Sequence, residues 1–166
     1  QDPDVVMIGE IRDIETADIA VQASLTGHLV LSTLHTNSAL GALSRLHDMG
    51  VESFLLSSSI VGVLSQRLVR RLCEHCKKPY DATKEELDIL QNLIEKHENT
   101  PVIYQPEGCE HCNYSGYNGR TGIYELIPID KTLRSMIHQK DNLQKMEAHI
   151  RPKAASIRED GCKRVL

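Results

Sequence analysis

Two short apolar runs, each leading to a polar residue and separated by a segment of helix length, constrain the fold of this chain most. The first run, residues 5–8, leads to Glu10. The second run, residues 29–34, leads to His35. Continuous apolar runs are typical of strands buried on both faces of a parallel sheet. A strand, a crossover helix and a second strand place both strand ends at one sheet edge, where open α/β sheets bind ligands. We therefore expect Glu10 and His35 to face a common site.

The rest of the first half of the chain predicts helices. They are expected over residues 16–25 with Gly27 at the end, from Asn37 or Ser38 to Gly50, and over residues 52–72. In the last of these, apolar residues recur every four positions and form one stripe: Leu56, Ile60, Leu64, Leu68 and Leu72. Arg67, Arg70 and Arg71 would then share one helix face. The ordinary explanation is that cations favour the C-terminal end of a helix.

The second half contains shorter elements and most of the turn residues. Its pattern predicts a helix over residues 83–96 with a capping box at Thr83, an extended piece over 102–104, tight turns over 114–122, a strand over 123–127, and helices over 130–138, 142–150 and 153–160. The composition changes at Cys73, where the cysteines begin. We divide the chain accordingly into residues 1–72, 73–122 and 123–166.

Two motifs carry a family resemblance. Gly-Glu-Ile-Arg-Asp at residues 9–13 and Thr-Gly-His-Leu-Val-Leu-Ser-Thr-Leu-His-Thr-Asn at residues 26–37 resemble the Walker B segment and the histidine box of secretion ATPases. These are the hexameric motors of type II secretion and type IV pilus systems. The resemblance covers nearly the whole chain. It implies an α/β fold with a RecA-like P-loop NTPase core in residues 1–72, and ATP hydrolysis with Mg²⁺.

The phosphate loop of such a core is absent from these 166 residues, because no Gly-x-x-x-x-Gly-Lys-Ser/Thr motif occurs in them. The chain also opens at Gln1 with a core-type strand almost at once. We therefore expect it to be the C-terminal fragment of a larger ATPase and to be inactive by itself.

The resemblance assigns Glu10 to the Walker B glutamate, which holds the attacking water or a magnesium-bound one. The ordinary alternative is that Glu10 caps or forms a salt bridge at the strand end. His28 and His35 are both in the histidine box, but seven extended residues span roughly 23 Å. Only His35 should share an edge with Glu10, so we expect it to sense the γ-phosphate, assisted by Thr33 or Thr36. We expect His28 to support the helix-to-strand turn or to reach a neighbouring subunit.

Two arginines are less well determined by the sequence. Arg12 either binds phosphate or pairs with a carboxylate such as Glu15 or Asp18. Arg67 lies in a segment, residues 65–73, that is similar to a family signature. The resemblance suggests that Arg67 lies near the nucleotide or the next subunit.

Four cysteines form two Cys-x-x-Cys pairs, Cys73 with Cys76 and Cys109 with Cys112. Two such turns complete a tetrahedral four-thiolate zinc site with no open position, which makes the site structural. The alternative is a redox dithiol, which explains one pair but not two. Cys162 has no expected partner. The sequence thus predicts a zinc-bearing subdomain over residues 73–122.

Charge and family together complete the expected function. The formal net charge of −4 argues against general nucleic-acid binding, and no apolar run approaches the ~20 residues of a membrane span. The resemblance implies a hexameric ring that drives pseudopilus assembly, located in the cytoplasm of a Gram-negative bacterium. It also implies peripheral association with the inner membrane through secretion-platform proteins. Residues 51–59 resemble the type II secretion members more than the pilus members of the family. Alternatives are a type IV pilus assembly ATPase and a zinc-dependent interaction module without catalysis.

Overall fold

The computed structural model describes residues 3–36, 38–94 and 102–166. The chain divides into two compact units. The first comprises residues 1–65 and 126–154, and the second comprises residues 66–125 and 155–166. The division into residues 1–72, 73–122 and 123–166, which follows the change in composition, stays a prediction. No helix in the described ranges combines the length and the apolar character needed to cross a bilayer.

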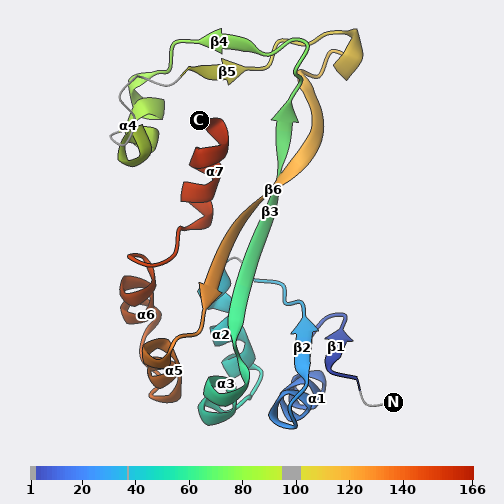
Figure 1. The fold of residues 1–166 in the computed structure, drawn as a ribbon, viewed down its shortest axis with the longest axis vertical. Helices are drawn as coiled ribbons and strands as arrows, with labels where there is room; N and C mark the ends of the chain where they lie inside the picture. The colour runs from blue at the N-terminus through green and yellow to red at the C-terminus, as the bar shows by residue number, and fades with distance from the viewer. Residues whose placement is uncertain (1–2, 37, 95–101) are drawn as a thin grey trace. The chain divides into compact units, whose positions relative to one another are not determined.

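The strand–helix–strand motif expected from the sequence is present in the first unit (Figure 1). Strands β1 (Val5–Ile8) and β2 (Leu29–Ser32) pair in parallel, with Val5 opposite Leu29 and Ile8 opposite Ser32. Helix α1 (Ile14–Leu25) connects them and begins where the carboxylate of Asp13 accepts the N–H of Thr16 at 2.8 Å. The two strands therefore end at the same edge.

Four further helices build the core of the first unit. They are α2 (Ala39–Asp48), α3 (Ser53–Ser59), α5 (Lys131–His138) and α6 (Leu143–Ile150). Ser38 caps α2 by accepting the N–H of Gly41. Asn37, the other predicted cap, lies outside the described residues. The largest fully buried side chains in this core are Val51, Ile127 and Leu133.

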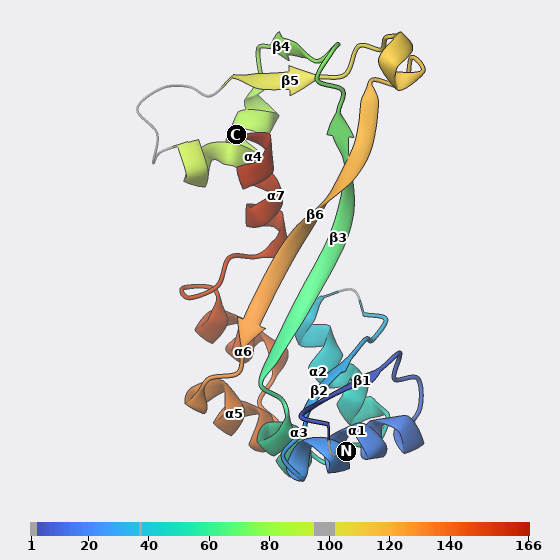
Figure 2. The same ribbon diagram turned by 45° about the vertical axis from the view of Figure 1, so that its right-hand side comes forward.

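The helix predicted over residues 52–72 is wrong beyond Ser59. The chain instead forms the short α3 and then strand β3 (Gly62–Leu72), which pairs with β6 (Tyr117–Pro128). Figure 2 shows these two strands side by side, with opposed arrows. A repeat of four residues marks one face of a helix but also one face of a strand, whose period is two. On β3, two residues of this repeat are exposed, since Leu64 is 58% and Leu68 56% accessible.

The second unit contains a small antiparallel pair, β4 (Lys78–Tyr80) with β5 (Ile103–Gln105). Helix α4 (Lys84–Ile94) begins with the predicted capping box, in which Thr83 and Glu86 exchange hydrogen bonds. The predicted end of this helix, to residue 96, lies outside the described residues. Helix α7 (Ile157–Val165) packs against α4. A short 3-10 turn, Glu110–Cys112, contains Cys112 and directly follows Cys109, the other member of the second cysteine pair.

Two predictions in the second half are wrong. Residues 117–122 belong to strand β6 rather than to a turn loop, although Gly119 keeps a left-handed φ of 75° within it. The last helix begins at Ile157 instead of Lys153 and includes Gly161. Ser156 and Glu159 form a capping box at its start, a signal present in the sequence.

Candidate functional site

Glu10 and His35 meet at the shared end of β1 and β2. The Nε2 atom of His35 lies 3.1 Å from Oε1 of Glu10. The side chain of Glu10 is 23% exposed and that of His35 is 89% exposed, so the pair is accessible from solvent. The predicted convergence of these two side chains is confirmed. Their catalytic roles stay predictions.

Hydrogen bonds beyond the strand ladder fix this convergence. The hydroxyl of Thr33 donates to the carbonyl oxygen of Gly9 at 2.7 Å, and the N–H of Ile11 donates to the carbonyl of Thr33 at 3.0 Å. These bonds continue the alignment of the two chains past Ile8 and Ser32, where the strands end. Thr33 therefore holds the backbone that carries Glu10, whereas Thr36 bonds to the carbonyl of Ser38.

Arg12 is the second partner of Glu10. Its Nη2 atom lies 2.7 Å from Oε2 of Glu10, and its side chain is 76% exposed. The hydrogen bond from Arg12 is the main cause that lowers the pKa of Glu10, with smaller contributions from the charges of Arg12 and His35 against an opposing effect of burial. The sequence suggested Glu15 or Asp18 as partners of Arg12. Positions i and i+2 share one side of an extended chain, a signal that could have identified Glu10.

His28 lies at the opposite end of β2 and belongs to a turn. Its Nδ1 atom is 3.0 Å from the carbonyl oxygen of Ala23 and 3.1 Å from the hydroxyl of Thr26. Gly27 between them has a left-handed φ of 103°, which closes the turn from α1 into β2. These contacts fit the expected support of the helix-to-strand turn.

The three arginines expected on one helix face lie on strand β3 instead. Successive side chains of a strand point to opposite faces, so Arg67 and Arg71 share one face and Arg70 takes the other. The guanidinium of Arg70 lies 3.8 Å from the centre of the Tyr117 ring, a cation–π contact within the second unit. The role of Arg67 near nucleotide or a neighbouring subunit stays a prediction.

The four predicted zinc ligands come together in the second unit. The Sγ atoms of Cys73, Cys76, Cys109 and Cys112 all lie within 4.8 Å of one another. Three of the pairs are 3.8 to 3.9 Å apart. Four sulfurs bound tetrahedrally at ~2.3 Å from zinc are separated by about 3.8 Å. The arrangement therefore fits a four-thiolate metal site.

Backbone N–H groups surround these sulfurs in the way that bound thiolates require. Cys109 and Gly116 each donate to Sγ of Cys112 at 3.2 Å, and Gly108 donates to Sγ of Cys76 at 3.3 Å. Burial, the largest single cause, opposes ionisation of Cys112, but the backbone donors of Cys109 and Gly116 together with hydrogen bonds from the thiols of Cys76 and Cys109 lower its pKa to about 6. Burial and the neighbouring thiols raise the pKa of Cys109 to about 11. Four thiolates this close therefore need a cation to ionise together.

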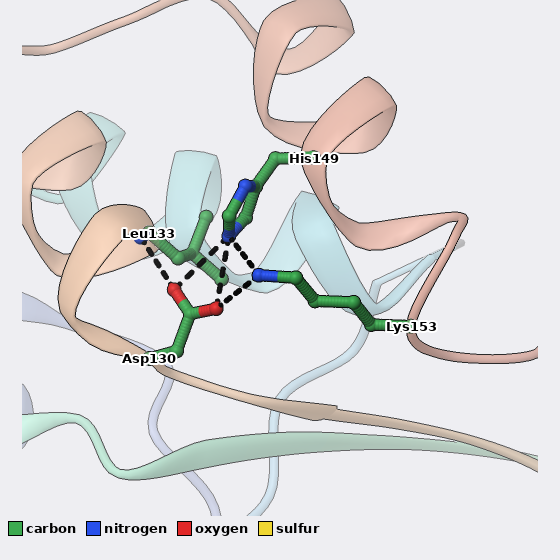
Figure 3. Close-up of polar contacts among 4 residues, drawn as sticks. All are labelled: Asp130, Leu133, His149 and Lys153. Carbon is green, nitrogen blue, oxygen red and sulfur yellow. Dashed lines mark hydrogen bonds and ion pairs between the residues drawn. The ribbon is translucent and has the colours of Figure 1, made fainter.

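A second cluster of polar side chains lies in the first unit (Figure 3). The carboxylate of Asp130 accepts the N–H of Leu133 at 2.8 Å, and it binds Nε2 of His149 at 2.9 Å and Nζ of Lys153 at 2.7 Å. These contacts tie the start of α5 to α6 and lower the pKa of Asp130 well below its usual range, with the backbone N–H of Leu133 as the largest cause. No local pattern in the sequence indicated that these residues meet. Since Asp130 serves as the cap of α5, we interpret the cluster as structural.

Comparison with known proteins identifies the family. The family described as "Type II/IV secretion system protein" matches residues 1–166. The chain belongs to this family. The type II secretion system ATPase E of Vibrio cholerae is 58% identical over 165 residues, covering 99% of this chain and 32% of that protein. The type II secretion system protein E of Pseudomonas aeruginosa is also 58% identical, over 100% of this chain and 32% of its own length.

A relative named for type IV pilus assembly also matches this chain. The type IV pilus assembly ATPase TfpB of Acinetobacter baylyi is 46% identical, over 100% of this chain and 28% of its own length. The chain thus spans about a third of the length of the curated relatives cited here.

A solved structure supports the fold. The X-ray structure of the Legionella pneumophila ATPase DotB covers 98% of this chain and 35% of its own chain, with a TM-score of 0.60 and 19% identity. At that identity the likeness supports the α/β fold alone.

Proposed function

We propose that this chain is the C-terminal third of a secretion ATPase that hydrolyses ATP to drive type II protein secretion. The single observation that carries the proposal is the convergence of Glu10 and His35 at one sheet edge, 3.1 Å apart. The family membership of the whole chain supports it. The phosphate loop of the site would come from the rest of the longer protein, so the chain alone would not turn over ATP.

Glu10 would be the carboxylate that positions the attacking water. The water oxygen bonds to the γ-phosphorus as the bond to the bridging oxygen breaks, ADP leaves, and Glu10 accepts the proton. Mg²⁺ bound with ATP would supply neutralisation of the phosphate charge, and a carboxylate is a ligand type that it accepts. His35, mostly exposed beside Glu10, would contact the γ-phosphate.

The tetracysteine cluster would hold one zinc ion. Its four sulfurs leave no open coordination position, so the metal would fold the loops around Cys73 and Cys112 rather than take part in hydrolysis. The backbone donors to sulfur on Cys76 and Cys112 would stabilise the charged thiolates.

The family also guides the cellular setting of the proposal. We expect the full-length protein to form a hexameric ring in the cytoplasm, to associate with the inner membrane through platform proteins, and to drive pseudopilus assembly. The names of the most similar relatives cited here, at 58% identity, favour type II secretion. A pilus assembly ATPase is the second candidate, because a protein of that name matches at 46% over the whole chain.

The test is the ATPase activity of the full-length protein with Glu10→Gln. Loss of a catalytic base typically lowers kcat by about 10²- to 10⁴-fold. Glu15→Gln is the matched control, since Glu15 is an exposed carboxylate in the first turn of α1, and its kcat should stay unchanged. Full activity of the Glu10 variant would contradict the role of Glu10 as the base, whereas absence of ATP turnover in the natural full-length protein would favour a zinc-dependent interaction module.

A further inference from the structure

Both carboxylate oxygens of Glu10 are engaged by neighbouring side chains. Arg12 Nη2 lies 2.7 Å from Oε2, and His35 Nε2 lies 3.1 Å from Oε1. A general base must offer a free lone pair to the water that it deprotonates. In the arrangement that the structure shows, each oxygen of Glu10 already accepts from one charged or polar partner, and both compete with a water for the carboxylate.

The engaged carboxylate is also a weaker base. Hydrogen bonding from Arg12 lowers the pKa of Glu10, and the efficiency of a general base falls as its pKa falls. The geometry and the charge therefore agree that Glu10, held in this way, is poorly suited to activate water.

Arg12 and His35 are exposed enough to move away from Glu10. The side chain of Arg12 is 76% exposed and that of His35 is 89% exposed, whereas Glu10 is only 23% exposed. Exposed ion pairs are worth little. A triphosphate carries more negative charge than one carboxylate, and the planar guanidinium of arginine binds phosphate oxygens in a bidentate manner. A nucleotide at this edge would therefore compete with Glu10 for both side chains.

We infer that Arg12 and His35 hold Glu10 in a resting state before nucleotide binds, and that the triphosphate frees the carboxylate by drawing both side chains onto itself. This inference rests on the proposed function, since it assumes a nucleotide beside Glu10. Arg12 then acts as a positioning residue that couples nucleotide binding to the release of the base. The carboxylate of Glu10 would therefore become available to accept a proton only after the triphosphate has bound.

The test is a double-mutant cycle on nucleotide affinity in the full-length protein. The probe is the non-hydrolysable analogue β,γ-imido-ATP with Mg²⁺, so that turnover does not affect the dissociation constant. Glu10→Gln removes the competitor for Arg12 and should tighten binding about twofold to fivefold, the range of an exposed ion pair. In the Arg12→Gln background the same change should have a clearly smaller effect.

The direction in which Arg12→Gln changes the effect of Glu10→Gln distinguishes two explanations. One is competition between Glu10 and the nucleotide for Arg12, and the other is electrostatic repulsion between Glu10 and the nucleotide. If Arg12 stayed on Glu10 throughout, its removal would unmask the carboxylate, and Glu10→Gln would then tighten binding more in the Arg12→Gln background. An equal or larger effect there would overturn the inference. Arg158→Gln is the control, since Arg158 is an exposed arginine on α7, and it should leave the effect of Glu10→Gln unchanged.

The pH dependence of turnover gives a second, independent measurement. The acid limb of kcat/KM reports the free enzyme and that of kcat reports the complex. Arg12→Gln should move the acid limb of kcat/KM to higher pH and leave that of kcat in place. Equal movement of both limbs would mean that Arg12 never leaves Glu10. Failure of the analogue to bind at all would instead overturn the proposed function.

Discussion

Gly116 joins the two cysteine pairs of the second unit through its own backbone. Its N–H donates to Sγ of Cys112 at 3.2 Å, and its carbonyl oxygen accepts the N–H of Cys73 at 3.0 Å. Its φ of 77° lies in the left-handed region, and a Cβ atom there would lie 2.5 Å from Cβ of Pro106. Glycine is therefore required at this position for both conformational and steric reasons.

Gly116→Ala should lower the free energy of unfolding more than Gly119→Ala does. Both glycines have left-handed φ values, 77° and 75°, but a Cβ at Gly119 meets nothing within 4 Å. The two variants share the conformational cost, so the difference reports the clash with Pro106, about 1–3 kcal/mol of the free energy of unfolding. Denaturant unfolding of the metal-loaded chain measures it. Equal stability of the two variants would show that the loop yields without cost.

Removal of zinc should loosen the second unit and leave the first folded. Structural zinc in small sites contributes on the order of 10 kcal/mol to folding. A strong chelator should therefore open the chain around Cys73 and Cys112 to proteolysis and reduce the far-UV CD signal in part. Unchanged proteolysis and CD after complete removal of the metal would count against a structural site.

The four-cysteine cluster should bind one zinc ion per chain. Elemental analysis should find one zinc per chain in the natural sequence and in Cys162→Ser, because Cys162 lies on α7 and is outside the four-sulfur cluster. Cys112→Ser should lose most of the metal. Equal zinc content in both variants would exclude Cys112 as a ligand.

The two histidines should differ in what they affect. If the full-length protein hydrolyses ATP as proposed, His35→Gln should lower its kcat about 10- to 100-fold, since a hydrogen bond to a charged group is worth about 1.5–3 kcal/mol. His28→Gln should leave kcat nearly unchanged and reduce thermal stability, because His28 bonds to Ala23 and Thr26 in a turn. The reverse pattern would place the phosphate contact at His28.

Asp130 should stabilise the first unit in a pH-dependent way. Its pKa is lowered in the folded state, so its contribution is complete above the unfolded pKa of about 4 and is lost as the pH falls below that value. Asp130→Asn keeps a capping side chain for α5 and loses the pairing with His149 and Lys153. Asp130→Ala also loses the cap, which is worth about 1 kcal/mol.

Denaturant unfolding at several pH values checks this prediction. The gap between the natural sequence and Asp130→Asn should be widest near neutral pH and should begin to narrow as the pH falls below about 4. A gap that stays constant with pH would mean that the charge of Asp130 does not contribute.

The sequence was sufficient where a local pattern has one structural meaning. The apolar runs before Glu10 and His35 predicted a parallel pair, and the pairing of Val5 with Leu29 confirms it. The spacing of the cysteines predicted the cluster that the four sulfurs form. Both patterns carry their geometry within a few residues.

The sequence was insufficient where a pattern is ambiguous or where contacts are distant. The four-residue repeat through Leu64 and Leu68 suits either a helix or a strand, and only the pairing of β3 with β6 decides between them. The approach of His149 to Asp130 depends on the packing of α5 and α6, which no local motif encodes. The contact of Arg12 with Glu10 was within reach of the sequence, because both follow the same strand.

The register between β1 and β2 sets how far along the sheet edge Glu10 and His35 lie from each other. Ile8 lies opposite Ser32, and the bond from Thr33 to Gly9 carries that alignment onward to the two side chains beyond. One residue inserted within 29–34 would carry the imidazole ~3.3 Å along the strand, or force a slip that turns every apolar side chain to the wrong face. Substitutions within residues 29–34 are therefore easier to tolerate than insertions or deletions, which change the length of this segment.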